Sequence, residues 1–254
     1  MVSRAAVYVM WLREMKRFGR AKSRVVGSLV MPVFFLAFLG LGFRRMPVPG
    51  LGGGLNYLQF LVPGMVGMTL LFSSTMQGLS VLWDREFGFL KEIMVAPVTR
   101  VSIVLGRIAG GVTTNLLQAV LILVVSVGLG FRARSVAGLL LGLGFMVLIS
   151  FTFIGLGLIF ASRMKDMQGF GMVMNFVVFP LFFLSGAMYP LDNLPRAVRL
   201  VSYLDPLTYG VDGLRGALSG VSGFPPAVDL AAMAGSALVM VVLGAYAFEK
   251  SESV

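Results

Sequence analysis

Stretches without Asp, Glu, Lys or Arg dominate the chain, and short segments that carry charges or Gly and Pro separate them. A mostly apolar helix of about 18 or more residues is long enough to cross the hydrocarbon core of a bilayer. The pattern predicts six membrane spans, at about 25–43, 57–82, 104–130, 137–161, 168–189 and 230–248. The expected fold class is an all-α polytopic membrane protein, in which 25–254 form a single transmembrane domain behind an N-terminal helix at 1–24.

The N-terminal segment carries seven cations before the first span begins. At 100° per residue, its apolar residues Val7, Trp11, Met15 and Phe18 fall on one helical face, and its arginines gather on another. Such a helix is typical of the membrane interface, where it contacts lipid. We expect an amphipathic interfacial helix; the alternative is a solvated basic tail. The residues expected to anchor it are Trp11, Arg13, Arg17, Phe18 and Arg20.

The segment after the second predicted span, about 83–97, carries mixed charges. Phe87, Leu90 and Met94 lie at helical spacing, and Pro97 is expected to stop the helix. A short amphipathic helix of this kind holds the membrane with one face and leaves its charged face for a partner protein. The alternative is a plain connection between two spans.

The segment at about 190–228 contains five prolines among regularly placed leucines and valines. It is too broken to span and too apolar to be disordered. We expect short helices that dip into the outer leaflet; a surface domain lying on the membrane is the alternative. Non-helical backbone at that depth must be buried in protein or meet water.

The distribution of Lys and Arg predicts the orientation. With the N-terminus inside, the inner segments hold 14 cations and the outer segments 7. Both termini are therefore expected in the cytoplasm, and the protein in the cell (plasma or inner) membrane as a multi-pass chain.

Composition excludes several classes of function. Apolar residues make up 57% of the chain and charged residues 13%, which is too few to cover a soluble enzyme. The net charge of +10 comes from cations beside apolar runs, so we expect no nucleic-acid partner. There is no Cys and no His, and the sequence lacks the Gly-x-x-x-x-Gly-Lys-Ser/Thr loop that binds ATP phosphates. We expect no catalytic residue, metal site or cofactor in this chain, and an energy source in another chain.

Two sets of sequence motifs in this chain resemble those of a known protein family. Trp83-Asp-Arg-Glu86-x-Gly88-x-x-Lys-Glu92 followed by Ala96-Pro97-Val98-Thr99-Arg100 resembles the loop after the second span of type-2 ABC exporter permeases. The outer segment resembles theirs in Leu184-Ser-Gly186, Pro190-Leu191, Leu194-Pro195, Asp205-Pro206-Leu207-Thr208-Tyr209 and Asp212-Gly-Leu-Arg215. The likeness covers nearly the whole chain. It is greatest for short drug-resistance permeases of the daunorubicin type, and exporters of lipid-linked polysaccharides and nodulation factors share the motifs.

The resemblance implies a homodimer above two copies of a separate ABC ATPase, in which ATP and magnesium are expected. It implies a coupling helix toward that ATPase, formed by Trp83, Asp84, Arg85, Glu86, Phe87, Gly88, Lys91, Glu92 and Pro97. Lys91 departs from relatives that often carry an acid there. It also implies an outer re-entrant gate before the sixth span, comprising Gly186, Pro190, Leu194, Pro195, Asp205, Pro206, Leu207, Tyr209, Asp212 and Arg215.

The transport path is expected between the two copies, along the first, second and fifth spans. Candidate wall residues are Phe72, Asn115, Gln118 and Asn175. For each polar residue among them the alternative role is a hydrogen bond between helices. The expected function is the membrane subunit of an ATP-driven exporter of an amphipathic or lipid-like substrate, such as a drug, a lipid or a lipid-linked glycan. The alternatives are an ion-coupled secondary transporter, which the absence of ionisable groups in mid-span disfavours, and a membrane scaffold that does not transport.

Overall fold

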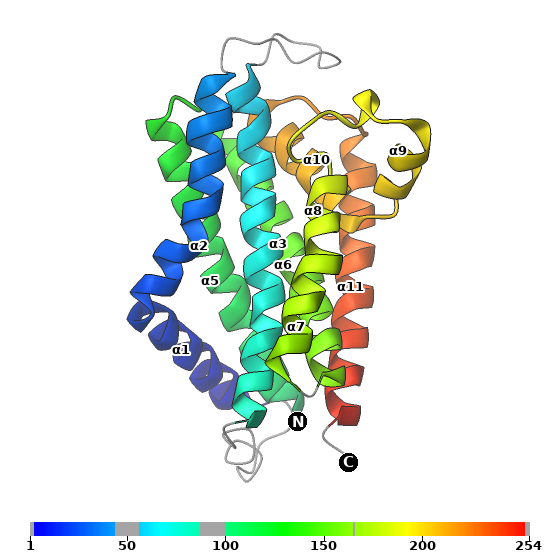
Figure 1. Cartoon of the computed structure of the whole chain (residues 1–254). Coiled ribbons are helices and arrows are strands. Elements are labelled where there is room, and N and C mark those ends of the chain that lie inside the picture. Colours follow the sequence, from blue (N-terminus) through cyan, green and yellow to red (C-terminus); the bar gives the residue numbers. More distant parts are fainter. Residues whose placement is uncertain (1–2, 44–55, 87–99, 165, 252–254) are drawn as a thin grey trace.

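A computed structural model describes residues 3–43, 56–86, 100–164 and 166–251 (Figure 1). Within these ranges the regular structure is helical and no strand is present. Four helices there are long and apolar enough to cross a membrane: Tyr57–Gly78, Ser102–Gly128, Val136–Arg163 and Pro226–Ala247. They correspond to the second, third, fourth and sixth predicted spans. Their parent helices are α3 (Tyr57–Glu86), α5 (Arg100–Gly128), α6 (Val136–Arg163) and α11 (Pro226–Ser251).

The N-terminal part is a bent pair of helices. Helix α1 (Arg4–Arg20) is followed by α2 (Lys22–Phe35), which continues through the π-helical turn η1 (Leu36–Gly40). The two arms, Arg4–Arg20 and Val25–Gly40, meet at 68°. Figure 1 shows α1 leaning across the lower end of the bundle, while α2 runs along it. A separate helix thus lies within the segment 1–24, from Arg4 to Arg20, and its position at the membrane interface stays a prediction.

The fifth predicted span, 168–189, is shorter in the structure. Helix α7 (Met167–Val173), the π-turn η2 (Met174–Val178) and α8 (Phe179–Leu184) form one apolar rod, Gln168–Leu184. It ends at Leu184 because the chain turns at Gly186, whose φ of +69° lies in the left-handed region that favours glycine. Hydropathy continued past this turn and made the predicted span too long.

Short elements follow in the segment predicted at 190–228. They are η3 (Leu191–Asn193), α9 (Arg196–Ser202) and α10 (Pro206–Ser219). Helix α10 is buried against α3, α6 and α11, whereas η3 and α9 are largely exposed. Figure 1 places all three beside the upper end of α8 and α11, opposite the end at which α1 begins and α11 finishes.

Helix α6 is the centre of the bundle and packs closely on α3 and α11. Glycines permit this approach: a Cβ on Gly157 would lie 2.6 Å from the Thr75 carbonyl oxygen of α3. On the other side of α6, a Cβ on Gly155 would meet the backbone of Met240 in α11. Small residues that let backbones touch are the usual means of helix association in membranes, because lipid supplies no hydrophobic driving force between helices.

Candidate functional site

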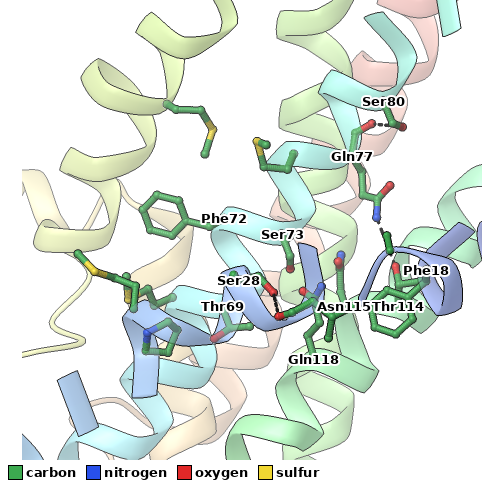
Figure 2. Close-up of a pocket in the computed structure, with 18 of the residues that line it drawn as sticks. Phe18, Ser28, Thr69, Phe72, Ser73, Gln77, Ser80, Thr114, Asn115 and Gln118 are labelled. Atoms are coloured by element: carbon green, nitrogen blue, oxygen red, sulfur yellow. Dashed lines mark hydrogen bonds between the residues drawn. The ribbon is translucent and has the colours of Figure 1, made fainter. Parts of the chain in front are cut away.

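A cavity of about 460 Å³ opens among α1, α2, α3, α5 and the rod formed by η2 and α8 (Figure 2). Its apolar wall contains Phe72 of α3, whose ring meets Phe179 of α8 with centroids 4.9 Å apart. Asn115 and Gln118 of α5 also line it. Three of the four predicted path residues thus surround one cavity. Asn175 does not lie with them: it is exposed on η2, and its role in a path stays a prediction.

Polar groups of the cavity wall tie α3 to α5. Asn115 Nδ2 donates a hydrogen bond to Ser74 Oγ at 2.8 Å, and Gln77 Nε2 donates to Thr114 Oγ1 at 3.3 Å. The alternative role, a hydrogen bond between helices, is therefore observed for the amide nitrogen of Asn115. The acceptor atoms are a separate matter: Asn115 Oδ1 and Gln118 Oε1 are buried without a hydrogen-bond partner.

Helix α1 forms one wall of the cavity and is held by α5. Trp11 Nε1 donates a hydrogen bond to Thr113 Oγ1 at 3.1 Å. Glu14 packs on Gly110 of α5 so closely that a Cβ added to this glycine would lie 2.7 Å from the Cβ of Glu14. Gly106 and Gly110 are one helical turn apart, so α1 lies directly on the α5 backbone. This packing disfavours the solvated tail. Phe18 lines the cavity, Arg13 is partly buried and Arg20 is exposed.

The predicted interfacial and coupling elements meet at Arg17 and Trp83. The Arg17 guanidinium lies 5.8 Å from the centre of the Trp83 ring, a cation–π arrangement, and 4.0 Å from Glu14 Oε1. Trp83 to Glu86 form the last turn of α3, so the structure has no break between the second span and the start of the coupling segment. The predicted coupling residues Phe87, Gly88, Lys91, Glu92 and Pro97 lie outside the described residues, as do the side chains of Asp84, Arg85 and Glu86.

The predicted outer gate is built around α10. Asp205 caps this helix, because its carboxylate accepts a hydrogen bond from Leu207 N at 2.9 Å, and Pro206 occupies the first helical position. Burial raises the pKa of Asp205 to about 7, although the bond from Leu207 opposes the rise. Tyr209 Oη donates to the Tyr203 carbonyl at 2.9 Å.

Arg215 joins α10 to the end of α8. Its Nη2 donates to the Gly186 carbonyl at 2.9 Å, and its guanidinium lies 3.9 Å from the centre of the Phe60 ring in α3. Its Nη1 is 3.6 Å from Asp212 Oδ1. Burial lowers the pKa of Arg215 to about 10, and Asp212 opposes the fall. Asp212 in turn accepts hydrogen bonds from the backbone of Gly223 and Phe224.

The remaining gate residues differ in burial. Leu207 is fully buried, and Gly186 supplies the turn described above. Pro190 and Leu194 are partly buried, and Pro195 is exposed at the start of α9.

Two buried acids were missed by the reading of the sequence. Glu14 is buried in the cavity wall, and Asp229 at the start of α11 is buried with neither carboxylate oxygen hydrogen-bonded. Glu14 had a detectable signal, because it is the only acidic residue before Asp84 and stands among cations. The pair Gly106 and Gly110 was a signal as well, since a Gly-x-x-x-Gly spacing marks a close helix contact.

Proteins of known description resemble the chain over most of its length. The inner membrane transport permease YadH of Escherichia coli K12 is 29% identical over 224 residues, which are 87% of this chain and 85% of that protein. Nodulation protein J of Rhizobium leguminosarum bv. trifolii is 28% identical over 238 residues, or 93% and 86% of the two chains. A putative transport permease, ycf38, of Cyanophora paradoxa is 27% identical over 210 residues, or 82% and 72%.

The family model described as "ABC-2 type transporter" matches residues 5–219, which include α1, the cavity and the outer segment through α10. Several apolar helices of spanning length and the inner-membrane relative agree with a multi-pass membrane protein. Membership of this family indicates a transporter subunit rather than an enzyme. The chain belongs to the ABC-2 type transporter family of membrane permeases.

Proposed function

We propose that this chain is the membrane-spanning subunit of an exporter driven by a separate ABC ATPase, and that it moves an amphipathic or lipid-like substrate outward. The observation that carries the proposal is the family match across 5–219 in a chain that has no phosphate-binding loop of its own. The energy must then come from a partner, which binds ATP and magnesium. Two relatives are named as transport permeases, which supports transport over a scaffold role.

The proposed arrangement has six spans with both termini in the cytoplasm. The rod of α7, η2 and α8 is the fifth span despite its length, since a local thinning of the bilayer accommodates a short helix at modest cost. Helix α1 lies at the inner surface. The excess of Lys and Arg on the inner segments supports this orientation.

The coupling element is proposed at 83–97, on the cytoplasmic end of α3. The unbroken helix from Tyr57 to Glu86 supports it, because a push on the last turn is transmitted along a rigid rod. The contact of Trp83 with Arg17 supports it too, since movement of that turn would carry α1 with it. A desolvated charge pair at a protein interface costs about 2–5 kcal/mol when one partner is removed.

Substitution of Glu86 tests the coupling. Glu86→Arg should leave the chain folded, inserted and dimeric, but should weaken ATPase association or abolish substrate-stimulated ATP hydrolysis, so that transport fails. Glu86→Asp keeps the charge and should keep activity. Phe87→Ala or Leu90→Ala should instead lower stability, because each loosens the element from the membrane. Normal transport by Glu86→Arg together with its ATPase would contradict the assignment.

The rival mechanism, ion coupling, has a separate test. The purified chain alone is placed in vesicles under a proton or sodium gradient. Uptake or efflux without the ATPase would favour a secondary transporter over the exporter proposed here.

A further inference from the structure

The cavity among α1, α2, α3 and α5 has a wall that accepts hydrogen bonds more than it donates them. Asn115 is 1% exposed and Gln118 6%, and the side-chain oxygen of each has no hydrogen-bond partner. Glu14 is 5% exposed and also has an oxygen without a hydrogen bond, but Arg17 Nη1, a donor that itself makes no hydrogen bond, lies 4.0 Å from it. Leaving such an acceptor buried and unpaired costs about 1–3 kcal/mol. The two amide oxygens in one cavity wall therefore indicate missing donors.

The hydroxyl groups of the wall cannot supply those donors. Each of them already donates to a backbone carbonyl of its own helix: Ser28 to Val25, Thr69 to Met65, Ser73 to Leu70, Ser80 to Gln77 and Thr114 to Gly111. Their oxygens keep lone pairs toward the cavity, which adds further acceptors. Figure 2 shows Ser73, Thr114, Asn115 and Gln118 gathered on one side of the cavity and Phe72 on the other.

The acceptors lie at two levels. Gly110, against which Glu14 packs, and Gln118 are eight residues apart on α5, which corresponds to a rise of about 12 Å. The amide oxygens of Asn115 and Gln118 thus form one level, and the Glu14 carboxylate, beside Arg17, forms a second level nearer the end of the bundle where α1 lies. A small polar head can occupy the first level while the rest of the molecule follows the apolar wall.

The rest of the wall suits an apolar body. It is formed by aromatic rings and flexible thioethers, which adapt to alkyl chains and rings alike; these are Phe18, Phe72, Phe179, Met31, Met68, Met76 and Met174. The volume of about 460 Å³ lies within the range of about 300–1,000 Å³ of small-molecule sites.

We propose that this cavity, within a single copy of the chain, binds an amphiphile whose head carries hydrogen-bond donors, an ammonium or a hydroxyl group, and that Asn115 and Gln118 accept from it. The inference rests on the proposed function, for which it names the substrate class. A quaternary ammonium of equal charge has no N–H to donate to these acceptors and should therefore bind more weakly.

The test compares two probes that differ in donors and not in charge: dodecylammonium, with three N–H groups, and dodecyltrimethylammonium, with none. The chain has two tryptophans, Trp11 and Trp83, and Trp83 lines the cavity. Full-length Trp11→Phe protein in phosphatidylcholine nanodiscs, without ATPase, therefore reports binding through Trp83 fluorescence, with protein-free discs as the blank. Dodecanol in a third titration shows whether an uncharged hydroxyl head also binds.

Dodecylammonium should bind at least about tenfold more tightly than its trimethyl counterpart, since a hydrogen bond to a charged group contributes about 1.5–3 kcal/mol. Asn115→Leu combined with Gln118→Met should remove that preference, whereas Gln118→Glu, which keeps an acceptor, should retain it. Gln59→Met, the same change outside the cavity, should also retain it.

Equal affinity of the parent for both ammonium probes, or a preference that survives in the double variant, would overturn the inference. Neither result bears on the ATPase, so the proposed function would stand if Glu86→Arg still abolished transport. Conversely, normal transport by Glu86→Arg would remove the coupling assignment and leave the binding preference intact.

Discussion

At the scale of single residues, Asp205 makes stability depend on pH. Burial raises its pKa from 3.8 to about 7, so the folded protein holds a proton that the unfolded chain releases at lower pH. The stability that protonated Asp205 contributes is therefore fully present below about pH 4 and is lost as the pH rises through about 7. The free energy of unfolding should fall across this window by an amount on the order of 1–4 kcal/mol, and the thermal midpoint in detergent should fall with it. Asp205→Asn keeps the helix cap but cannot ionise, so the slope should flatten. An unchanged slope in this variant would assign the dependence to another group.

A second residue-scale prediction concerns two arginines in the same segment. Arg215 is buried and bonds Gly186, whereas Arg199 pairs with exposed Asp192 at 3.3 Å. Arg215→Lys loses the planar stack on Phe60 and the bond to the carbonyl, so the free energy of unfolding should fall by about 1–3 kcal/mol. Arg199→Lys should change it by less than about 1 kcal/mol. Equal effects in chemical denaturation would show that the burial of Arg215 does not matter.

The roles of such residues were only partly predictable. The sequence placed Asp205, Asp212 and Arg215 in one apolar, proline-rich segment. Because unpaired charges are costly in such a segment, the sequence favoured two arrangements: a position at the outer headgroup level, or pairing among these residues, which Asp212 and Arg215 show. It could not reveal that Asp205 caps a helix, because that role depends on where α10 begins. Glu14 was hidden for a related reason: its burial is decided by Gly110, almost a hundred residues away.

At the scale of elements, the contact of α3 with α6 depends on glycine. A Cβ on Gly157 would press on the Thr75 carbonyl of α3, and backbone cannot move aside cheaply. Gly157→Ala should therefore destabilise the bundle by about 1–3 kcal/mol. Gly144→Ala in the same helix meets no atom within 4 Å and should be neutral or stabilising, by up to about 1 kcal/mol. Thermal unfolding of both variants in one detergent tests this, and similar losses in both would argue against a close contact.

The outer segment offers an element-scale test of gating. Leu207 is fully buried at the start of α10, whereas Leu204 is 83% exposed two residues before Pro206. The chain has no cysteine, so single-Cys variants carry one label site. Leu207→Cys should react with an impermeant thiol reagent added outside faster during turnover with the ATPase than at rest, and Leu204→Cys should react alike in both states. Equal labelling of Leu207→Cys at rest and in turnover would leave α10 as packing rather than a gate.

Element boundaries were predictable to within a few residues, and the exceptions have local causes. Charge-free stretches located the helices of the third, fourth and sixth predicted spans, and the Gly- and Pro-rich segment before Tyr57 located the start of the second. Hydropathy extended the fifth past Gly186, where backbone conformation and not polarity ends the rod. It also divided α3 at Leu82, although a helix continues through charged residues once they leave the membrane.

At the scale of the whole molecule, apolar faces on α2 and η2 point away from the rest of the chain. Phe34 on α2 is 50% exposed and Phe176 on η2 is 79% exposed. Both belong to the helices that are expected to line a path between two copies. We predict that the chain forms a homodimer in which these faces contact the partner copy. A mass measurement in nanodiscs should show the dimer. When differently tagged copies carrying Phe34→Cys and Phe176→Cys are mixed and oxidised, a disulfide-linked dimer should form. Leu238→Cys on α11, also exposed, faces lipid in this arrangement and should not crosslink. Crosslinking through Leu238→Cys alone would move the interface to α11, and a monomer that transports with its ATPase would refute the dimer.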